Sequence, residues 1–210
     1  MKPSVKVCGV KDPAFAAAAA RRGVDYLGVI FAASSPRAVT GAAAQAVAAA
    51  ARAARPSHPP RIVGVFVSHA VPEIVSLAAA VPLDVVQLHG RYDAAAVQAI
   101  QAAGREVWRL SAAPGDAGVG EDAALLDGRT ADRCGGTGVR ADWSRVAELK
   151  GRGLRVVLAG GLAADTARAA AATGADILDV NSSLETAPGE KSVAKLDEFL
   201  ACCERAALLQ

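Results

Sequence analysis

Short, continuous apolar segments alternate with longer alanine-rich segments from one end of the chain to the other. Inside the short segments, polar and apolar positions do not alternate, which is typical of parallel strands covered on both faces. The pattern therefore predicts buried parallel strands. The predicted strands are Val5–Cys8, Tyr26–Phe31, Ile62–Val67, Val85–Leu88, Glu106–Leu110, Ala124–Asp127, Arg155–Ala159 and Ile177–Val180.

The intervening segments have strong helix formers and helical length. Asp12, Thr40 and Asp93 stand where an N-cap is expected, and Pro13 suits a first helical turn. Glycines at 23, 104 and 174 follow helical segments at the C′ position. The predicted helices are Pro13–Arg22, Ala42–Ala54, Ala70–Ala80, Ala94–Ala103 and Asp165–Ala172.

About eight strand-then-helix units predict an α/β fold, a single (β/α)₈ TIM barrel domain over residues 1–210. The fifth unit is an exception, because Ala112–Glu121 is rich in Gly, Pro and Ala and predicts a short or absent helix. An open doubly wound sheet is the alternative architecture. That fold normally carries a Gly-rich loop after its first strand, which Cys8-Gly9-Val10-Lys11 is not.

Composition narrows the class further. The 210 residues carry a formal net charge of +2 and a mean hydropathy of +0.27, so one large core and no strong field for nucleic acid are expected. No apolar run reaches the ~18 residues of a membrane span, and the start lacks a signal-peptide core. Cys8, Cys134, Cys202 and Cys203 form no zinc motif or disulfide framework. We expect a cytoplasmic protein with free thiols, the last two packing on a helix.

In a barrel, chemistry occurs at the carboxyl-terminal ends of the strands. Gly160-Gly161 follows the seventh predicted strand and Asn181-Ser182-Ser183 follows the eighth, the places where barrels often bind a phosphate. Gly136-Thr137-Gly138 could close over the same anion. Two ordinary turns are the alternative interpretation of these loops.

Cys8 and Asp127 end the first and sixth predicted strands, which makes them a candidate base and acid. Lys6 and Lys11 lie close in sequence to Cys8 and would favour its thiolate. From the residues alone, a small packing residue is the commoner interpretation of Cys8, whereas the position of Asp127 between a strand and a glycine loop favours function over a turn carboxylate. Arg37 follows the stiff Ser35-Pro36 pair and suits a substrate carboxylate, unless it is a solvated surface arginine.

The chain resembles the phosphoribosylanthranilate isomerase family of tryptophan biosynthesis. The resemblance spans nearly the whole chain, in the family's order. The stretches that carry it are Lys6-Val7-Cys8-Gly9, Ser34-Ser35-Pro36-Arg37, Val65-Phe66-Val67, Gln87-Leu88-His89-Gly90, Leu126-Asp127, Gly135-Gly136-Thr137-Gly138 with Asp142-Trp143, Leu158-Ala159-Gly160-Gly161-Leu162, and Asp179-Val180-Asn181-Ser182 through Glu185-Thr186-Ala187-Pro188-Gly189.

The resemblance implies an Amadori rearrangement of N-(5-phosphoribosyl)anthranilate, without metal or coenzyme. It implies Asp127 as the acid, Cys8 as the base and Arg37 as the residue that binds the anthranilate carboxylate. Phosphate binding is implied for Gly160, Gly161, Ser182 and neighbouring amides. Asp179 is implied to be a polar residue near the sugar. The expected partner is this small phosphorylated substrate, with the chain a monomer or homodimer.

Three positions depart from the family pattern: Gly128, Cys134 and Ser183, the last standing where the family usually has glycine. A Cβ at Ser183 would crowd the phosphate if its φ were positive. Two other functions stay open. One is isomerisation of the analogous histidine-pathway aminoaldose, whose enzymes use carboxylates at both catalytic positions, unlike Cys8. The other is a catalytically silent barrel that only binds a phosphorylated metabolite.

Overall fold

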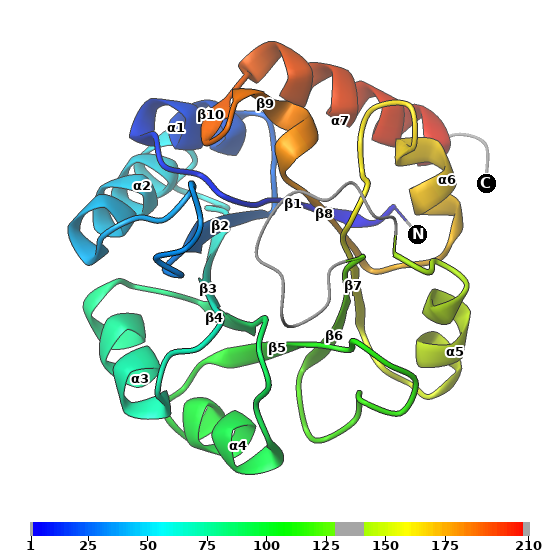
Figure 1. Cartoon of the computed structure of the whole chain (residues 1–210). Helices are drawn as coiled ribbons and strands as arrows, with labels where there is room; N and C mark the ends of the chain where they lie inside the picture. Colours follow the sequence, from blue (N-terminus) through cyan, green and yellow to red (C-terminus); the bar gives the residue numbers. More distant parts are fainter. Residues whose placement is uncertain (1, 129–140, 208–210) are drawn as a thin grey trace.

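Eight parallel strands close into a barrel, and the first strand pairs with both the second and the eighth (Figure 1). The computed structural model describes residues 2–128 and 141–207, with side chains through residue 204. The closed ring excludes the open doubly wound sheet. The strands are β1 Ser4–Val7, β2 Tyr26–Ile30, β3 Arg61–Phe66, β4 Val85–Leu88, β5 Glu106–Leu110, β6 Ala123–Leu126, β7 Val156–Leu158 and β8 Ile177–Val180.

The predicted strands are all present, and β4, β5 and β8 have the predicted bounds. Each of the other five ends one residue earlier than predicted. Consequently Cys8 and Asp127 do not belong to the strands but follow them directly. This places both residues at the carboxyl-terminal rim of the barrel.

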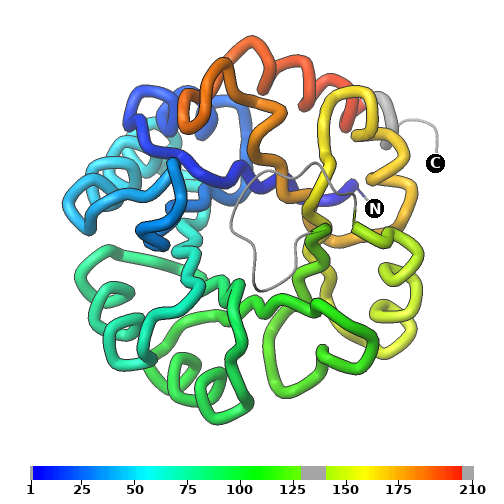
Figure 2. The backbone as a smooth tube through the Cα atoms, viewed as in Figure 1, coloured from blue at the N-terminus to red at the C-terminus, as the bar shows by residue number. Residues whose placement is uncertain are grey.

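Helices surround the ring of strands, and the chain passes around the barrel once in sequence order (Figures 1 and 2). A short 3₁₀ helix and a two-stranded hairpin separate β8 from the last helix. The remaining elements are α1 Pro13–Arg21, α2 Gly41–Ala54, α3 Val71–Ala80, α4 Ala94–Ala102, α5 Arg145–Gly151, α6 Ala167–Ala172, η1 Ser182–Leu184, β9 Glu185–Ala187, β10 Glu190–Lys191 and α7 Val193–Ala207.

The predicted caps set the helix ends. The Asp12 carboxylate accepts hydrogen bonds from the backbone N–H groups of Ala14 and Phe15, and Thr40 and Asp93 cap α2 and α4 in the same way. Gly23 has a φ of 81°, a left-handed conformation that a residue with a Cβ adopts at a cost. These local signals therefore make the turns from helix back to strand short.

Side chains alternate along the strands between the barrel interior and the outer layer against the helices. Interior apolar residues include Val63, Val85 and Leu125, while the larger outer cluster packs the strands against the helices. At the amino-terminal end of the interior, the fully buried Trp108 donates its indole N–H to Glu106 over 2.6 Å. Glu106 also pairs with Arg61 and Arg155, so a polar layer closes this end.

The fifth unit has no helix between β5 and β6, as the sequence predicts. A loop of residues 111–122 takes its place and is held from neighbouring helices. Arg145 donates hydrogen bonds to the carbonyl and hydroxyl oxygens of Ser111 and to the carbonyl of Ala113, over 2.8–2.9 Å. Arg152 donates to the carbonyl of Ala117 over 2.7 Å. The loop is therefore fixed, although it has no helical hydrogen bonds of its own.

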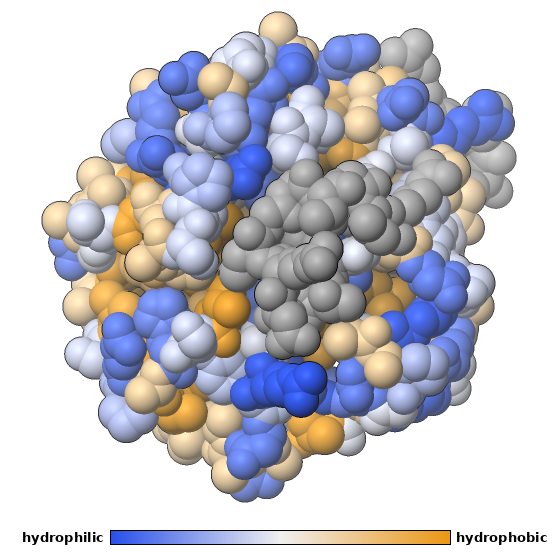
Figure 3. All heavy atoms as spheres, viewed as in Figure 1, coloured by the Kyte–Doolittle hydropathy of each residue, from blue (hydrophilic) through white to orange (hydrophobic). Residues whose placement is uncertain are grey.

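Among the described residues, none of the helices combines the length and apolar character needed to cross a membrane. Hydrophilic and hydrophobic residues are interspersed around the rim of the face shown in Figure 3. Cys203 packs into the outer core, and its burial raises the pKa of its thiol to about 11, in agreement with the packing role expected for the C-terminal cysteines.

Candidate active site

The sequence-predicted site residues that the structure describes lie around the carboxyl-terminal rim of the barrel. Cys8 follows β1, Arg37 follows β2, and Asp127 follows β6. Gly160-Gly161 follows β7, and the Asp179–Ser183 segment ends β8 and forms η1. Five segments distant in sequence therefore contribute to one mouth.

A buried ion pair lies directly beneath Cys8. Lys6 and Cys8 are two residues apart and point into the barrel, since Val5 and Val7 belong to the outer core. The Lys6 ammonium is completely buried and donates to the Asp179 carboxylate over 2.7 Å. Asp179 is only 7% exposed, so the pair is shielded from water and holds the two strands in register.

The thiol of Cys8 is predominantly protonated at neutral pH. Burial raises its pKa above the ordinary value of 9.0, and the negative charge of Asp179 adds to this effect. The ammonium groups of Lys6 and Lys191 oppose burial without overcoming it. Lys6 therefore favours the thiolate, as expected, although burial sets the net direction of the pKa. Lys11 instead contacts the carbonyl of Pro36.

Gly28 on β2 makes the space in which these groups meet. A Cβ built there would lie 3.0 Å from the Cys8 sulfur and 3.2 Å from the Lys6 nitrogen. Any side chain at this position would therefore push against both groups. The glycine is needed for close approach rather than for an unusual backbone angle.

Asp127 pairs with His89 on the far side of the mouth. The His89 Nε2 and Asp127 Oδ2 atoms are 3.5 Å apart, and both side chains are largely buried. Gly160, with a φ of 79°, allows this arrangement, because a Cβ there would lie 3.0 Å from Asp127 Oδ1. The glycine predicted to approach a phosphate thus also makes room for the acid.

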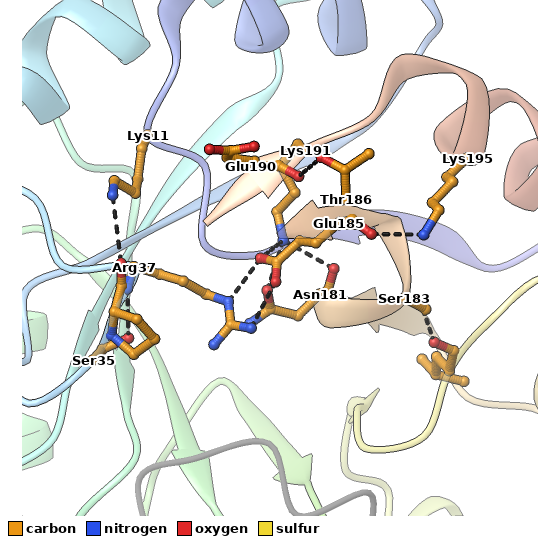
Figure 4. Close-up of polar contacts among 12 residues, drawn as sticks. Lys11, Ser35, Arg37, Asn181, Ser183, Glu185, Thr186, Glu190, Lys191 and Lys195 are labelled. Atoms are coloured by element: carbon orange, nitrogen blue, oxygen red, sulfur yellow. Dashed lines mark hydrogen bonds and ion pairs between the residues drawn. The ribbon is translucent and has the colours of Figure 1, made fainter. Parts of the chain in front are cut away.

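Arg37 is held by a carboxylate of its own protein (Figure 4). Its Nε and Nη2 atoms each donate to Glu185 over 2.7 Å, in a bidentate pair. Lys191 also donates to Glu185, over 2.8 Å, and to the side-chain oxygen of Asn181 over 2.7 Å. Arg37 is 7% exposed, so it is not the solvated surface arginine of the alternative interpretation.

This cluster has one carboxylate and two cations. Burial on its own raises the pKa of Glu185, but hydrogen bonds from Arg37 and Lys191 outweigh it and lower that pKa to about 2. Burial lowers the pKa of Lys191, although its pairing with Glu185 opposes this. The mouth consequently keeps a net positive charge beside Cys8.

The loops after β7 and β8 present backbone donors. Within the part of the chain described, the N–H groups of Gly161 and Ser182 donate no hydrogen bond to the protein. The Ser183 hydroxyl donates to the carbonyl of Leu162 over 2.6 Å, which ties the two loops together. Ser183 does not have a positive φ, so the crowding considered for its Cβ does not arise from that conformation.

Gly136 and Gly138, the predicted closing loop, lie outside the described residues, as does Cys134. The sequence prediction also missed residues that the structure places in the site, above all Glu185 and Lys191. Both fall within or beside a stretch quoted for the family resemblance, and that stretch was the available signal. The role of Lys6 beneath Cys8 follows from strand alternation, which brings residues two apart to the same face.

Comparison with known proteins agrees with this geometry. Residues 5–201 match the family model described as N-(5'phosphoribosyl)anthranilate (PRA) isomerase. The chain is similar to the N-(5'-phosphoribosyl)anthranilate isomerase of Granulibacter bethesdensis, with 40% identity over 98% of this chain and 100% of the relative. It is 34% identical to the Neisseria gonorrhoeae enzyme of the same name, over 97% of this chain and 98% of that protein.

Solved structures are similar over the same extent. The crystal structure of phosphoribosyl anthranilate isomerase from Thermus thermophilus has a TM-score of 0.84 and 30% identity, covering 99% of this chain and 100% of the other. A phosphoribosyl anthranilate isomerase in complex with reduced 1-(o-carboxyphenylamino)-1-deoxyribulose 5-phosphate has a TM-score of 0.79 and 25% identity, covering 97% of this chain and 99% of the other.

Proposed function

Because the chain belongs to the N-(5'-phosphoribosyl)anthranilate isomerase family, we propose that Asp127 and Cys8 are the acid and base of its reaction. The activity is an aldose–ketose isomerisation in tryptophan biosynthesis. The observation that carries the proposal is the convergence of these two side chains, each on a strand end, at one barrel mouth.

The reaction needs a proton delivered to the ribose ring oxygen. When Asp127 donates it, the bond between C1 and the ring oxygen breaks, and the anthranilate nitrogen lone pair forms a C1–N iminium. His89, 3.5 Å from the Asp127 carboxylate, holds the acid in place and provides a second polar group near the released hydroxyl. Gly160 leaves the space that this geometry requires.

The second step removes the proton on C2. Cys8 takes this proton as a thiolate, and the electrons of the C2–H bond form a C1–C2 double bond while neutralising the iminium. The resulting enolamine gains a proton at C1 and releases the proton of its C2 hydroxyl group, which gives the ketone. Since burial keeps Cys8 protonated at rest, the thiolate is a minor species, and Lys6 and Lys191 stabilise it when it forms.

Two parts of the barrel mouth bind the substrate: Arg37 after β2, and the loops after β7 and β8. Glu185 engages the N–H of Nε and one N–H of Nη2 in Arg37, so the N–H groups of Nη1 and the second N–H of Nη2 remain for the anthranilate carboxylate. The N–H groups of Gly161 and Ser182 would bind the phosphate, and Ser183 would hold the phosphate loops together through Leu162. Asp179 and Lys6 form the floor beneath the sugar.

The test is a fluorescence assay with freshly prepared N-(5-phosphoribosyl)anthranilate and, in parallel, the histidine-pathway aminoaldose. Turnover of the first substrate by the wild type, lost in Cys8→Ala and Asp127→Asn, is the expected result. Turnover that survives both substitutions would remove these residues from the mechanism. Turnover of the aminoaldose alone would favour the competing isomerase activity. Turnover of neither substrate would favour a catalytically silent barrel that only binds a phosphorylated metabolite.

A further inference from the structure

A second cavity lies on the β4–β5 side of the molecule, where the fifth helix is missing. It has a volume of about 800 Å³. Its walls come from the loop after β4, the start of α4, the end of β5 and the loop that replaces the helix. The lining residues that matter to the argument are Arg91, Tyr92, Asp93, Arg109, Ala112 and Asp116.

Arg109 lies in the wall of this cavity, and its exposed fraction is only 9%. Its strand neighbours Trp108 and Leu110 belong to the barrel interior, so Arg109 points outward, away from Cys8 and Asp127. Within the described residues its guanidinium donates no hydrogen bond, and its Nε is fully buried without a partner. A buried guanidinium in this condition is costly unless an acceptor binds it.

The nearest carboxylate does not satisfy this need. Glu121 lies 4.0 Å from Arg109, beyond hydrogen-bond distance. Its two oxygens already accept hydrogen bonds from the backbone N–H groups of Gly118 and Val119, over 2.7 and 2.8 Å. Glu121 therefore shapes the loop, and the donors of Arg109 stay available to a ligand.

The residues that line the cavity indicate which kind of anion it can bind. Arg91 and Arg109 line the cavity together with Asp93 and Asp116, so the lining charges nearly balance and disfavour a dianion. Asp93 caps α4 and Asp116 accepts from the Ala113 N–H, which leaves the guanidinium groups as the free donors. Figure 3 shows a strongly hydrophilic group at the rim on this side of the mouth, and alanines and Tyr92 supply apolar walls.

We propose that this cavity is a second ligand site, separate from the catalytic mouth, which binds a small monocarboxylate with an apolar body through Arg109. The guanidinium takes the carboxylate by paired hydrogen bonds, and the apolar walls cover the rest of the ligand. The loop is held by Arg145 and Arg152, so the cavity is preformed. This site does not depend on the roles given to Cys8 and Asp127.

Benzoate is a suitable probe, measured by calorimetric titration and located by crystallography. Arg37→Ala removes the binding group of the catalytic mouth, so benzoate binding that persists in this variant reports the second cavity. In that background, Arg109→Met is expected to weaken binding roughly 10- to 100-fold, the equivalent of the 1.5–3 kcal/mol of hydrogen bonds to a charged group. Arg21→Met, an exposed arginine on α1, is the matched control and should leave binding unchanged.

A second variant protects the test against misfolding of Arg109→Met. Ala112→Phe narrows the cavity from its exposed rim, leaves Arg109 and Glu121 in place, and should weaken benzoate at least tenfold. Inorganic phosphate at the same ionic strength should bind more weakly than benzoate. The proposal would be overturned if neither Arg109→Met nor Ala112→Phe weakened benzoate binding. It would also be overturned if benzoate were found only beside Arg37, or if phosphate bound more tightly than benzoate.

Discussion

At the scale of single residues, the candidate site depends on where a few side chains lie rather than on how many residues of one type the chain has. Cys8 and Asp127 follow strands β1 and β6, and their position could be predicted because each ends an apolar run. Their immediate partners could not, since a lysine such as Lys6 inside an apolar strand carries no local sign that it is paired. Only strand pairing brings Lys6 beside Asp179.

The acid role of Asp127 leads to the first prediction. Asp127→Asn keeps the size and the polar contacts of the side chain but cannot donate an acidic proton. We expect kcat to fall roughly 10²- to 10⁴-fold, with KM changed less than about threefold. Steady-state fluorescence kinetics measure both. The control is Asp197→Asn, which removes a surface carboxylate on α7 that pairs with Arg22 at the end of α1, and it should retain full activity.

The pH dependence of the base gives the second prediction. Because burial raises the pKa of the Cys8 thiol above 9.0, the thiolate fraction grows about tenfold for each pH unit below that pKa. We expect the ultraviolet absorbance of the thiolate, taken as the difference between the wild type and Cys8→Ala, to keep rising from pH 7 to pH 9 rather than to level off near neutrality. A plateau of this difference below pH 8 would show that the Cys8 thiol is not held above its ordinary pKa.

At the scale of elements, the strand and helix pattern could be read from the sequence almost completely, because buried parallel strands and capped alanine-rich helices have strong local signals. The hairpin of β9 and β10 could not. It is only a few residues long, and its effect on the site comes from the contact of Glu185 with Arg37, which lies in the loop after β2 and 148 positions away in sequence. Its carboxylate nonetheless sets the direction of Arg37.

The hairpin leads to the third prediction. Glu185→Gln weakens the bidentate hold on Arg37, which we expect to raise KM for the anthranilate substrate roughly 10-fold while kcat falls less. Glu190→Gln changes an exposed carboxylate on the same hairpin and should leave KM near the wild-type value. The role assigned to Glu185 would be untenable if both variants had the same KM.

At the scale of the whole molecule, closure of the barrel brings the residues of the candidate site together. Five rim segments and the loop without a helix meet only because β1 pairs with β8. Periodicity indicated about eight units but could not show side-chain pairing across the ring, such as Arg37 with Glu185 or His89 with Asp127. These contacts depend on register, which local sequence does not encode.

The Arg37–Glu185–Lys191 cluster also ties distant parts of the molecule together, and its pKa predicts how stability responds to acid. Glu185 has a folded-state pKa of about 2 against an ordinary value of 4.5, so its contribution is fully present above pH 4.5 and is lost as the pH falls toward 2. The difference corresponds to a contribution on the order of 3 kcal/mol to the free energy of unfolding. Urea unfolding of the wild type at several pH values measures this loss.

Glu185→Gln separates this effect from other titrating groups. At pH 7 the variant leaves Arg37 and Lys191 without their carboxylate, so it should be less stable than the wild type by roughly 2–3 kcal/mol. As the pH falls toward 2, the wild type loses the same charge by protonation, and the two stabilities should converge. Parallel curves, with a constant difference from pH 7 to pH 2, would mean that the stabilisation comes from packing rather than from the ionised carboxylate.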